Sequence, residues 1–286
     1  GRLIMQTSGL KTKIKPSLVI MYMLLIFGAF LSLFPFYWLV VMATNSSSAF
    51  MKYPPVLVFG GQFMNNVHNL FSNIKFGLAM KNTIIVSLVK TVGGVFFCSM
   101  ASFYFAKFEF PGRKFLFGLC MFTMMIPPQL NMIPQLVIMN KIGWLSTLKA
   151  LIIPGLIPAF GIYWMNQYCC GAIHDDLLNS ARINGCSTFG LYRHVGFPII
   201  MPGSAFLFIY IFMDSWNDYL WPLIVTSNAS KNTLQVALAQ LQGAYNSTDY
   251  GMVMCGVMLA TLPLFIIFLL CSKQFTADIA AGSIKD

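Results

Sequence analysis

The sequence contains 286 residues, of which 57% are hydrophobic and only 9% are charged. A chain of this composition cannot keep most of its surface in water, which excludes an ordinary soluble protein and places the chain in a lipid bilayer. The formal net charge is +10, but the basic residues form no single dense patch. The charge therefore indicates membrane topology and contact with lipid headgroups rather than nucleic-acid binding.

Long apolar stretches predict an all-α membrane protein with six transmembrane helices. Residues 16–51, 115–140, 150–174 and 250–272 carry no Asp, Glu, Lys or Arg, and each can cross a hydrocarbon core of about 30 Å. Two further apolar stretches are interrupted, 82–106 by Lys90 and 195–225 by two aspartates. We expect the six spans at residues 16–43, 82–106, 115–140, 150–173, 195–225 and 251–272.

The distribution of basic residues predicts that both termini are cytoplasmic. With the N-terminus inside, the inner segments hold 11 Lys and Arg residues and the outer segments hold six. Residues 1–15, the loop 174–194 and the tail 273–286 are then cytoplasmic, and the loops 44–81 and 226–250 are external. The apolar run after residue 15 is too long for a signal peptide and lacks a small-residue cleavage site, so we expect a retained first helix.

The third and fourth predicted spans contain prolines that interrupt a helix. Pro127, Pro128 and Pro134 lie in the third span, and Pro154 and Pro158 lie in the fourth. Each proline removes a backbone donor, so the helix bends or breaks and the freed carbonyl groups need partners in the protein interior or in a water-lined cavity. Broken helices are common in transporters, but proline is frequent in other membrane helices too, so this pattern favours transport only weakly.

Three charged residues fall inside predicted spans. Asp214 and Asp218 are four residues apart and therefore share one helix face. An isolated carboxylate in lipid costs on the order of 3 kcal/mol or more, so these side chains should face a cavity, a partner chain or the outer interface. Two interpretations stay open: an aromatic belt at the headgroup level beside Trp216, and the lining of a polar translocation path. Lys90 either snorkels to the interface or turns inward to a carboxylate or to substrate hydroxyl groups.

Residues 174–203 interrupt the membrane pattern with small, polar and basic groups. Asp175 or His174 can cap a first short helix that runs to about Asn184 and has Arg182 near its end. Gly185 suits the left-handed position that follows a helix, and Ser187 or Thr188 can cap a second helix. We expect a helix-turn-helix on the cytoplasmic face, which either seats a partner protein or forms an elbow that touches only lipid.

The spacing in this break resembles the cytoplasmic "EAA" loop of ABC importer permeases. That loop reads Glu-Ala-Ala, three residues, Gly, nine residues, Ile, one residue, Leu-Pro. The matching positions here are Asn179, Ser180, Ala181, Gly185, Val195, Phe197 and Pro198. The two acidic groups of the pattern are absent, because Asn179 and Asn184 stand in their places. We therefore expect docking mainly by helix packing, with ionic contacts from Arg182, Arg193 or Asp176.

The rest of the chain indicates which group of ABC importer permeases it resembles. The phrases that carry it are "SFYFAKFEFPGRK", "MMIPPQLNMIPQLVIMNKIGWLST", "SWNDYLWPLIV", "TLQVALAQLQG" and "ATLPLFIIFLL". They look like the carbohydrate permeases of the maltose-transporter type, the smaller six-span partner. The resemblance implies a type I ABC importer permease fold with its core at about residues 76–272, in the cytoplasmic (inner) membrane of a bacterium.

The same resemblance implies the partners and the absence of catalysis by this chain. A second homologous permease would share the path, two ATPase subunits would bind ATP and Mg, and an extracellular or periplasmic sugar-binding protein would deliver the sugar. The chain has no G-x-x-x-x-G-K-[ST] motif, so hydrolysis must come from the partner ATPases. We expect no bound cofactor or metal, because the seven cysteines form no CxxC or Cys/His spacing.

Three groups of candidate functional residues follow. The ATPase-docking group is Asn179, Ser180, Ala181, Arg182, Asn184, Gly185, Phe189, Arg193 and Pro198. Sugar sites combine aromatic rings with a few polar groups, and the candidates for the translocation path are Lys90, Tyr163, Asn166, Tyr210, Asn217 and Asp218. The resemblance places the loop before the last span against the binding protein, and the contact candidates are Gln242, Gly243, Ala244, Tyr245, Asn246 and Ser247.

Alternative functions remain open at this point. An ion- or proton-coupled carrier would use Lys90, Asp214 and Asp218 as a relay and would need no ATPase. An ABC permease for a non-sugar solute would keep the same architecture. A membrane enzyme is not expected, since no nucleophile, base and metal cluster lies in or near a span.

Overall fold

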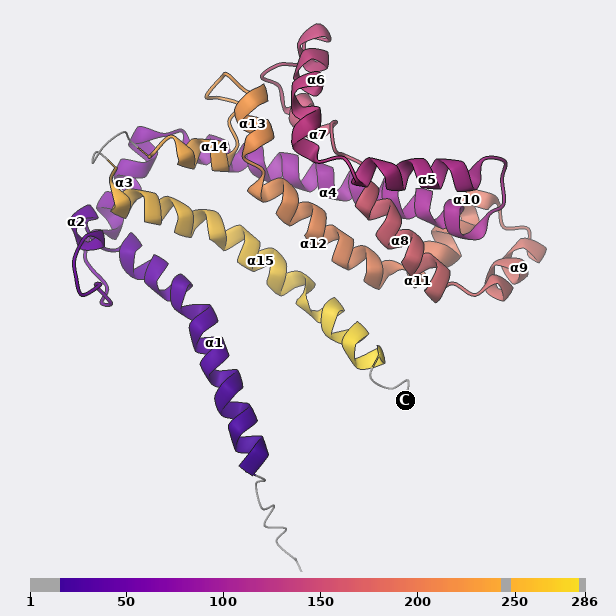
Figure 1. Cartoon of the computed structure of the whole chain (residues 1–286), viewed down its shortest axis with the longest axis horizontal. Coiled ribbons are helices and arrows are strands. Elements are labelled where there is room, and N and C mark those ends of the chain that lie inside the picture. Colours follow the sequence, from indigo (N-terminus) through magenta and orange to yellow (C-terminus); the bar gives the residue numbers. More distant parts are fainter. Residues whose placement is uncertain (1–15, 243–247, 283–286) are drawn as a thin grey trace, which may run out of the picture.

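The computed structural model describes residues 16–242 and 248–282, and that part of the chain contains only helices (Figure 1). Three unbroken helices are long and apolar enough to cross a membrane: α1 (Pro16–Ala43), α4 (Phe76–Lys107) and α15 (Tyr250–Gly282). Two bent pairs pass the same test together. They are α5 (Arg113–Met124) with α6 (Pro128–Lys141), bent by 100°, and the segment Thr188–Ile199 with α12 (Met201–Asn217), bent by 81°.

The remaining elements are shorter. They are α2 (Ser47–Phe50), α3 (Phe63–Asn73), α7 (Leu148–Ile152), α8 (Ala159–Ala172), α9 (Asp175–Ile183), α10 (Thr188–Gly190), the π-helix η1 (Leu191–Gly196), α11 (Phe197–Ile199), α13 (Leu220–Val225) and α14 (Leu234–Ala239). Helices α2, α3 and α14 gather at one end of the molecule, and α9 and α10 lie at the opposite end (Figure 1). The all-α class is confirmed for the described residues, with three to five spans by length and composition.

Prolines break the predicted third and fourth spans. Pro127 is extended and Pro128 begins α6, so the stretch expected as one span at 115–140 is two helices at a steep angle. Pro154 and Pro158 fall between α7 and α8. Helix α8 has 14 residues and covers about 21 Å at 1.5 Å per residue, which is less than the bilayer core. The fourth span at 150–173, and with it the count of six, therefore stays a prediction.

Helix α4 is the centre of the packing, with α8 and α12 lying against it. The face that it buries is built of small and polar residues, among them Ser87, Thr91, Gly94, Ser99 and Ser102. Small residues allow neighbouring membrane helices to approach closely, because no bulky side chain separates the backbones. The close approach of α8 and α12 to α4 thus follows from the composition of this face.

Gly94 marks the tightest of these approaches. A Cβ atom at this position would lie 2.7 Å from Ile211 Cδ1 on α12 and 3.0 Å from the carbonyl oxygen of Leu156. Beside it, Ser102 Oγ donates a hydrogen bond of 2.6 Å to the carbonyl oxygen of Ile162 on α8. The α4 face therefore combines close contact with interhelical hydrogen bonding.

Helix α1 is packed differently from the others. Its N-terminal half leans away from the body of the molecule, and none of its most apolar window is buried (Figure 1). It meets α15 through contacts such as that between the rings of Phe36 and Phe265, whose centroids are 6.5 Å apart. Lipid or a partner chain must cover the rest of this apolar helix.

Replacing Gly94 by leucine should destabilise the protein. The added side chain has no space between α4 and α12, and overpacking of this kind costs about 1–3 kcal/mol. The measurement is the thermal unfolding midpoint of the detergent-purified chain. The matched control is Gly118→Leu on α5, where a Cβ meets no atom within 4 Å; equal midpoints for the two variants would contradict the close packing at Gly94.

Candidate functional site

Helix α9 lies where the sequence predicts the first helix of the polar break. It begins with acidic residues in its first turn and ends with Arg182 in its last turn, in accord with the helix dipole. Asn184 follows, and its Nδ2 donates a hydrogen bond of 2.9 Å to the carbonyl oxygen of Ser180. Gly185 then adopts a φ of 77°, which confirms the predicted left-handed turn.

The second predicted helix also begins as expected. Ser187 Oγ accepts a hydrogen bond of 3.1 Å from the backbone N–H of Gly190, so Ser187 is the N-cap. The helix continues as the π-helix η1, a form that is rare and often found at functional sites. The Tyr192 hydroxyl in η1 lies 2.8 Å from Ser99 Oγ, which ties this segment to α4.

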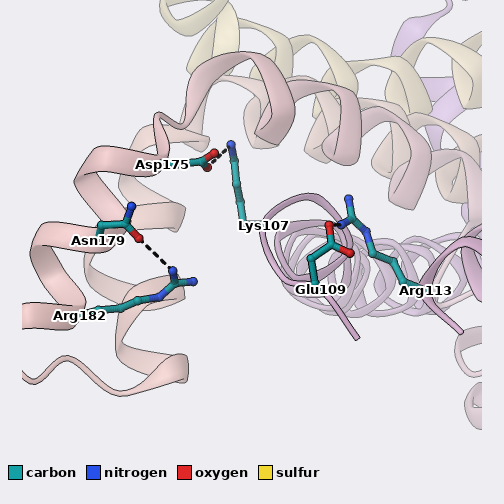
Figure 2. Close-up of polar contacts among 6 residues, drawn as sticks. All are labelled: Lys107, Glu109, Arg113, Asp175, Asn179 and Arg182. Atoms are coloured by element: carbon teal, nitrogen blue, oxygen red, sulfur yellow. Dashed lines mark hydrogen bonds and ion pairs between the residues drawn. The ribbon is translucent and has the colours of Figure 1, made fainter. Parts of the chain in front are cut away.

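One face of α9 is held against the C-terminal end of α4 (Figure 2). Lys107 Nζ lies 2.9 Å from Asp175 Oδ1. Leu178 is 1% exposed and belongs to the core cluster that includes residues of α4 and α8. The guanidinium of Arg182 stands 5.2 Å from the centroid of the Phe108 ring. We name these five residues the α9 clamp; the three on α9 share one helix face.

In the ion pair of the clamp, one partner is nearly buried and the other is exposed. The Lys107 side chain is 9% exposed and the Asp175 side chain is 76% exposed. The hydrogen bond from Lys107, together with its charge, lowers the pKa of the Asp175 carboxyl below its ordinary value of 3.8. A lowered pKa means that the stabilisation is complete above the ordinary value and is lost as pH falls through the folded-state value. The pair is therefore ionised throughout the neutral range, and salt weakens it more readily than pH.

The opposite face of α9 is free within this chain. Leu177 and Ile183 are exposed, Ile183 by 87%, although both are large apolar side chains. Arg182 is engaged inside the chain, because it also donates a hydrogen bond of 3.1 Å to Asn179 Oδ1 (Figure 2). A Cβ atom on Gly185 would meet nothing within 4 Å. What α9 presents outward thus combines the apolar Leu177 and Ile183 with the polar Asp176, Asn179 and Ser180.

The other predicted docking residues surround this surface. Ser180 and Asn184 are exposed, while Ala181 packs against the core cluster. Phe189 is half exposed, and its ring lies 6.0 Å from that of Tyr192. Arg193 and Pro198 are both exposed. The structure therefore brings the docking candidates together at one end of the molecule.

The loop after α4 completes this end. Arg113 and Glu109 form an ion pair, and they line a cavity of about 330 Å³ with the polar residues of the clamp (Figure 2). The ion pair joins a residue of the turn between α4 and α5 to the first residue of α5. The cavity is a polar cleft between two segments that are far apart in the sequence.

Three of the six path candidates share a second and larger cavity. Tyr210, Asn217 and Asp218 line a space of about 690 Å³ at the C-terminal end of α12. Asp214 lines it too, as the four-residue spacing of the aspartates predicts. Gln129 contributes from α6. This cavity lies where α6 meets α12 and the start of α13.

The other three path candidates lie elsewhere. Asn166 is buried and its Nδ2 donates a hydrogen bond of 3.4 Å to the carbonyl oxygen of Ser102, so it serves helix packing. Tyr163 is 40% exposed on α8 and does not line the 690 Å³ cavity. Lys90 is 7% exposed and lies beside Gly155 in the break between α7 and α8. Its side chain turns inward rather than snorkelling to the interface. It makes no ion pair within the described residues.

The expected contact with a binding protein falls mostly on residues 243–247, which lie outside the described residues. Gln242 is described and exposed. On the other side of the gap, Ser47 Oγ donates a hydrogen bond of 3.2 Å to the carbonyl oxygen of Thr248 and accepts one of 3.0 Å from the N–H of Tyr250. The start of α15 is thereby tied to α2.

Comparison with known proteins identifies this arrangement. Residues 94–272 match the family described as the inner membrane component of binding-protein-dependent transport systems. The chain belongs to this family. The match begins within α4 and covers both the α9 end and the 690 Å³ cavity, so the geometry above is that of a permease component.

Relatives of known function resemble the permease over nearly its full length. The lactose transport system permease protein LacG of Rhizobium radiobacter is 31% identical over 267 residues, covering 93% of this chain and 96% of LacG. The arabinooligosaccharides transport system permease protein AraQ of Bacillus subtilis (strain 168) is 29% identical over 277 residues, covering 94% and 95%. The sn-glycerol-3-phosphate transport system permease protein UgpE of Brucella abortus (strain 2308) is 27% identical, covering 89% and 93%.

A solved structure shares the fold of the permease. It is a bacterial ABC transporter involved in the import of the acidic polysaccharide alginate, and one of its chains matches with a TM-score of 0.76 at 21% identity. The match covers 89% of this chain and 95% of that chain. The resemblance of the sequence to ABC importer permeases is therefore confirmed.

Sequence reasoning missed the residues that hold α9 in place. Lys107 ends α4, Phe108 caps it, and Asp175 begins α9, 68 positions after Lys107. A basic residue at one end of a span and an acidic one at the start of the next inner loop is a weak signal, because the pairing depends on how α4 and α8 pack. The sequence offered no sign that Gln129 would reach the cavity beside α12.

Exchanging the charges of Lys107 and Asp175 should show whether coupling depends on the ion pair between them or on the charge at each position. Asp175→Asn removes one partner, and we expect a modest loss of ATPase coupling in the assembled transporter, on the order of two- to fivefold, because an exposed ion pair is weak. The double variant Lys107→Asp with Asp175→Lys should recover most of it. The measurement is ATP hydrolysis per transported substrate molecule; a double variant worse than the sum of the two single variants would contradict the pairing.

Proposed function

We propose that this chain is one of two permease subunits in an ATP-driven, binding-protein-dependent importer of sugars, with oligosaccharides as the substrate class. Two relatives that cover almost the whole chain are named for lactose and arabinooligosaccharides, which supports a saccharide. Membership of the family favours this importer over an ion- or proton-coupled carrier. Lys90, Asp214 and Asp218 then serve structure or substrate contact rather than a relay.

The proposed topology has six spans with both termini in the cytoplasm. The bent pair α5–α6, the break before α8 and the bend at the start of α12 each count as part of one span in this topology. Residues 1–15 and the tail after residue 272 then lie on the same side as α9. The end that carries α2, α3 and α14 faces outward, toward a binding protein that contacts the loop at residues 242–247.

We propose that α9 and the turn after it form the coupling element that docks into an ATPase subunit. The observation that carries this proposal is that large apolar side chains, Leu177 and Ile183, are exposed on a helix that is clamped to α4 on another face. Ile183 is almost fully exposed at the end of α9, two residues before the left-handed Gly185. An amphipathic helix with such anchors fits a groove on a partner protein.

The clamp suggests how movement would pass to the path. Two ATPase subunits that close on ATP would draw together this coupling element and its counterpart on the second permease. Because α9 is tied to α4, and α4 is packed against α12, the displacement would be transmitted to the cavity beside α12. Hydrolysis of ATP, with its Mg, belongs to the ATPase subunits, and this chain contributes no catalytic residue.

A change of Ile183 should test the docking face. Ile183→Asp places a charge in the proposed apolar contact, and we expect the ATPase to be lost from the complex that co-purifies with the tagged permease in mild detergent. Ile183→Leu keeps the apolar volume and should retain the ATPase. The second permease should co-purify with both variants. Retention of the ATPase by Ile183→Asp would refute the assignment of this face.

A change of Gly185 should test the turn. Gly185→Val forces a β-branched side chain into the left-handed region, so the turn must rearrange and coupling should fall by at least about tenfold. Gly185→Asn should retain most of the activity, since asparagine tolerates this conformation. The measurement is ATPase stimulation by the loaded binding protein; similar losses in both variants would show that the backbone conformation is not what matters.

A further inference from the structure

One face of α12 is polar and uncovered by the rest of the chain. Tyr210, Met213, Asp214 and Asn217 follow the i, i+3, i+4, i+7 spacing of a single face, and all four are exposed. The neighbouring residues 211, 212, 215 and 216 are buried against the body of the molecule. A carboxylate on a membrane-spanning helix is not stable against lipid, so this face must border water, a ligand or a partner chain.

The cavity at this face has the size of a ligand site. Its volume of about 690 Å³ lies within the range of about 300–1,000 Å³ that is usual for small-molecule sites. Gln129 and Met132 of α6 form one wall, and the segment 217–221 forms another. The cavity is therefore built by α6, which begins at the proline break, together with α12 and the residues that follow it.

An aromatic wall borders the cavity. The ring of Tyr210 lies 4.6 Å from that of Phe160 on α8, and Trp164 and Phe206 continue the row, with their rings 4.3 Å apart. Neighbours on two helices thus fix the orientation of Tyr210. A rigid aromatic face beside amides and carboxylates is the combination that binds the apolar faces and the hydroxyl groups of sugar rings.

The polar groups of the cavity have capacity for further hydrogen bonds. Asp214 makes no hydrogen bond or ion pair with any residue that the structure describes. Asp218 Oδ1 accepts one weak hydrogen bond of 3.4 Å from the backbone N–H of Trp221. An ionised carboxylate is an acceptor only, so Asp214 is suited to the hydroxyl groups of a ligand.

Lys90 is a buried charge that lies beside Gly155 and does not line this cavity. Lys90 is only 7% exposed, and it has no hydrogen bond or ion pair with the described residues. No described cation forms an ion pair with Asp214, which lines the cavity.

We propose that this cavity is a saccharide subsite that accepts sugars without negative charge and rejects anionic ones. The inference rests on the proposed sugar import and narrows its substrates to sugars without negative charge. Sugar hydroxyl groups donate to Asp214 while the ring packs on Tyr210. A uronate or a phosphate is repelled by the like charge of Asp214.

A cysteine at position 217 reports the charge of the cavity. In a cysteine-free form of the chain, assembled with its partner permease and ATPases, Asn217→Cys is treated with a cationic and an anionic methanethiosulfonate reagent. We expect the cationic reagent to react at least about tenfold faster, and Asp214→Asn to reduce this ratio severalfold. Ala229→Cys, on an exposed loop away from the cavity, should show no such effect of Asp214→Asn. Equal reactivity toward both reagents at position 217 would overturn the proposal.

Uptake by proteoliposomes tests the ligand class. The probe is the saccharide released from the co-purified binding protein and identified by mass spectrometry. We expect a saccharide without negative charge, a loss of at least about tenfold in kcat/KM for Asp214→Asn, and a smaller loss for Asp214→Glu, which keeps the acceptor. An anionic saccharide, or unchanged uptake in Asp214→Asn, would overturn the subsite even though ATPase co-purification still supports the importer. Failure of the ATPase to co-purify would count against the importer instead.

Discussion

The small polar face of α4 is the constraint on which the rest of the structure depends. Serine, threonine and glycine on this face let α8 and α12 approach closely, and the contact at Gly94 leaves no space for a side chain. Ser87 and Thr91 have no hydrogen-bond partner among the described residues, nor does Ser215 opposite them on α12. These residues therefore contribute to the interface mainly through their small size, which allows close packing, and less through hydrogen bonds. A helix with larger residues here would hold its neighbours apart and would separate both functional regions from their support.

The two functional regions lie at different positions along this one helix. At the C-terminal end, Lys107 and Phe108 hold α9, and the hydroxyl groups of Ser99 and Tyr192 join η1 to α4. Toward the other end, Lys90 lies near Asp218 and the cavity beside α12. Such an arrangement allows α4, α9 and α12 to move as one body. The breaks at Pro127 and at the start of α12 are then the places where the structure can flex.

Local chemistry made part of the candidate site predictable. The left-handed Gly185 and the Ser187 cap follow from rules of helix ends, and both are found in the structure. The common face of Asp214 and Asp218 follows from helix periodicity. Contacts between distant segments, such as that of Lys107 with Asp175, could not be predicted from the sequence, because they depend on how α8 packs on α4. Asn166 shows the same limit, since its residue type suits a sugar path but its position serves a helix contact.

The most direct test of the account is whether α9 and α4 stay together during the transport cycle. Spin labels at Asp176→Cys on α9 and at Phe97→Cys, an exposed position on α4, report this distance by double electron–electron resonance in the assembled transporter. The account predicts the same distance distribution with ADP and with a non-hydrolysable ATP analogue. In the same samples, the distance from Asp176→Cys to a label on the partner permease's matching loop should shorten. A change in the first distance with no change in the second would contradict the account, because α9 would then move independently of the helix that it is meant to carry.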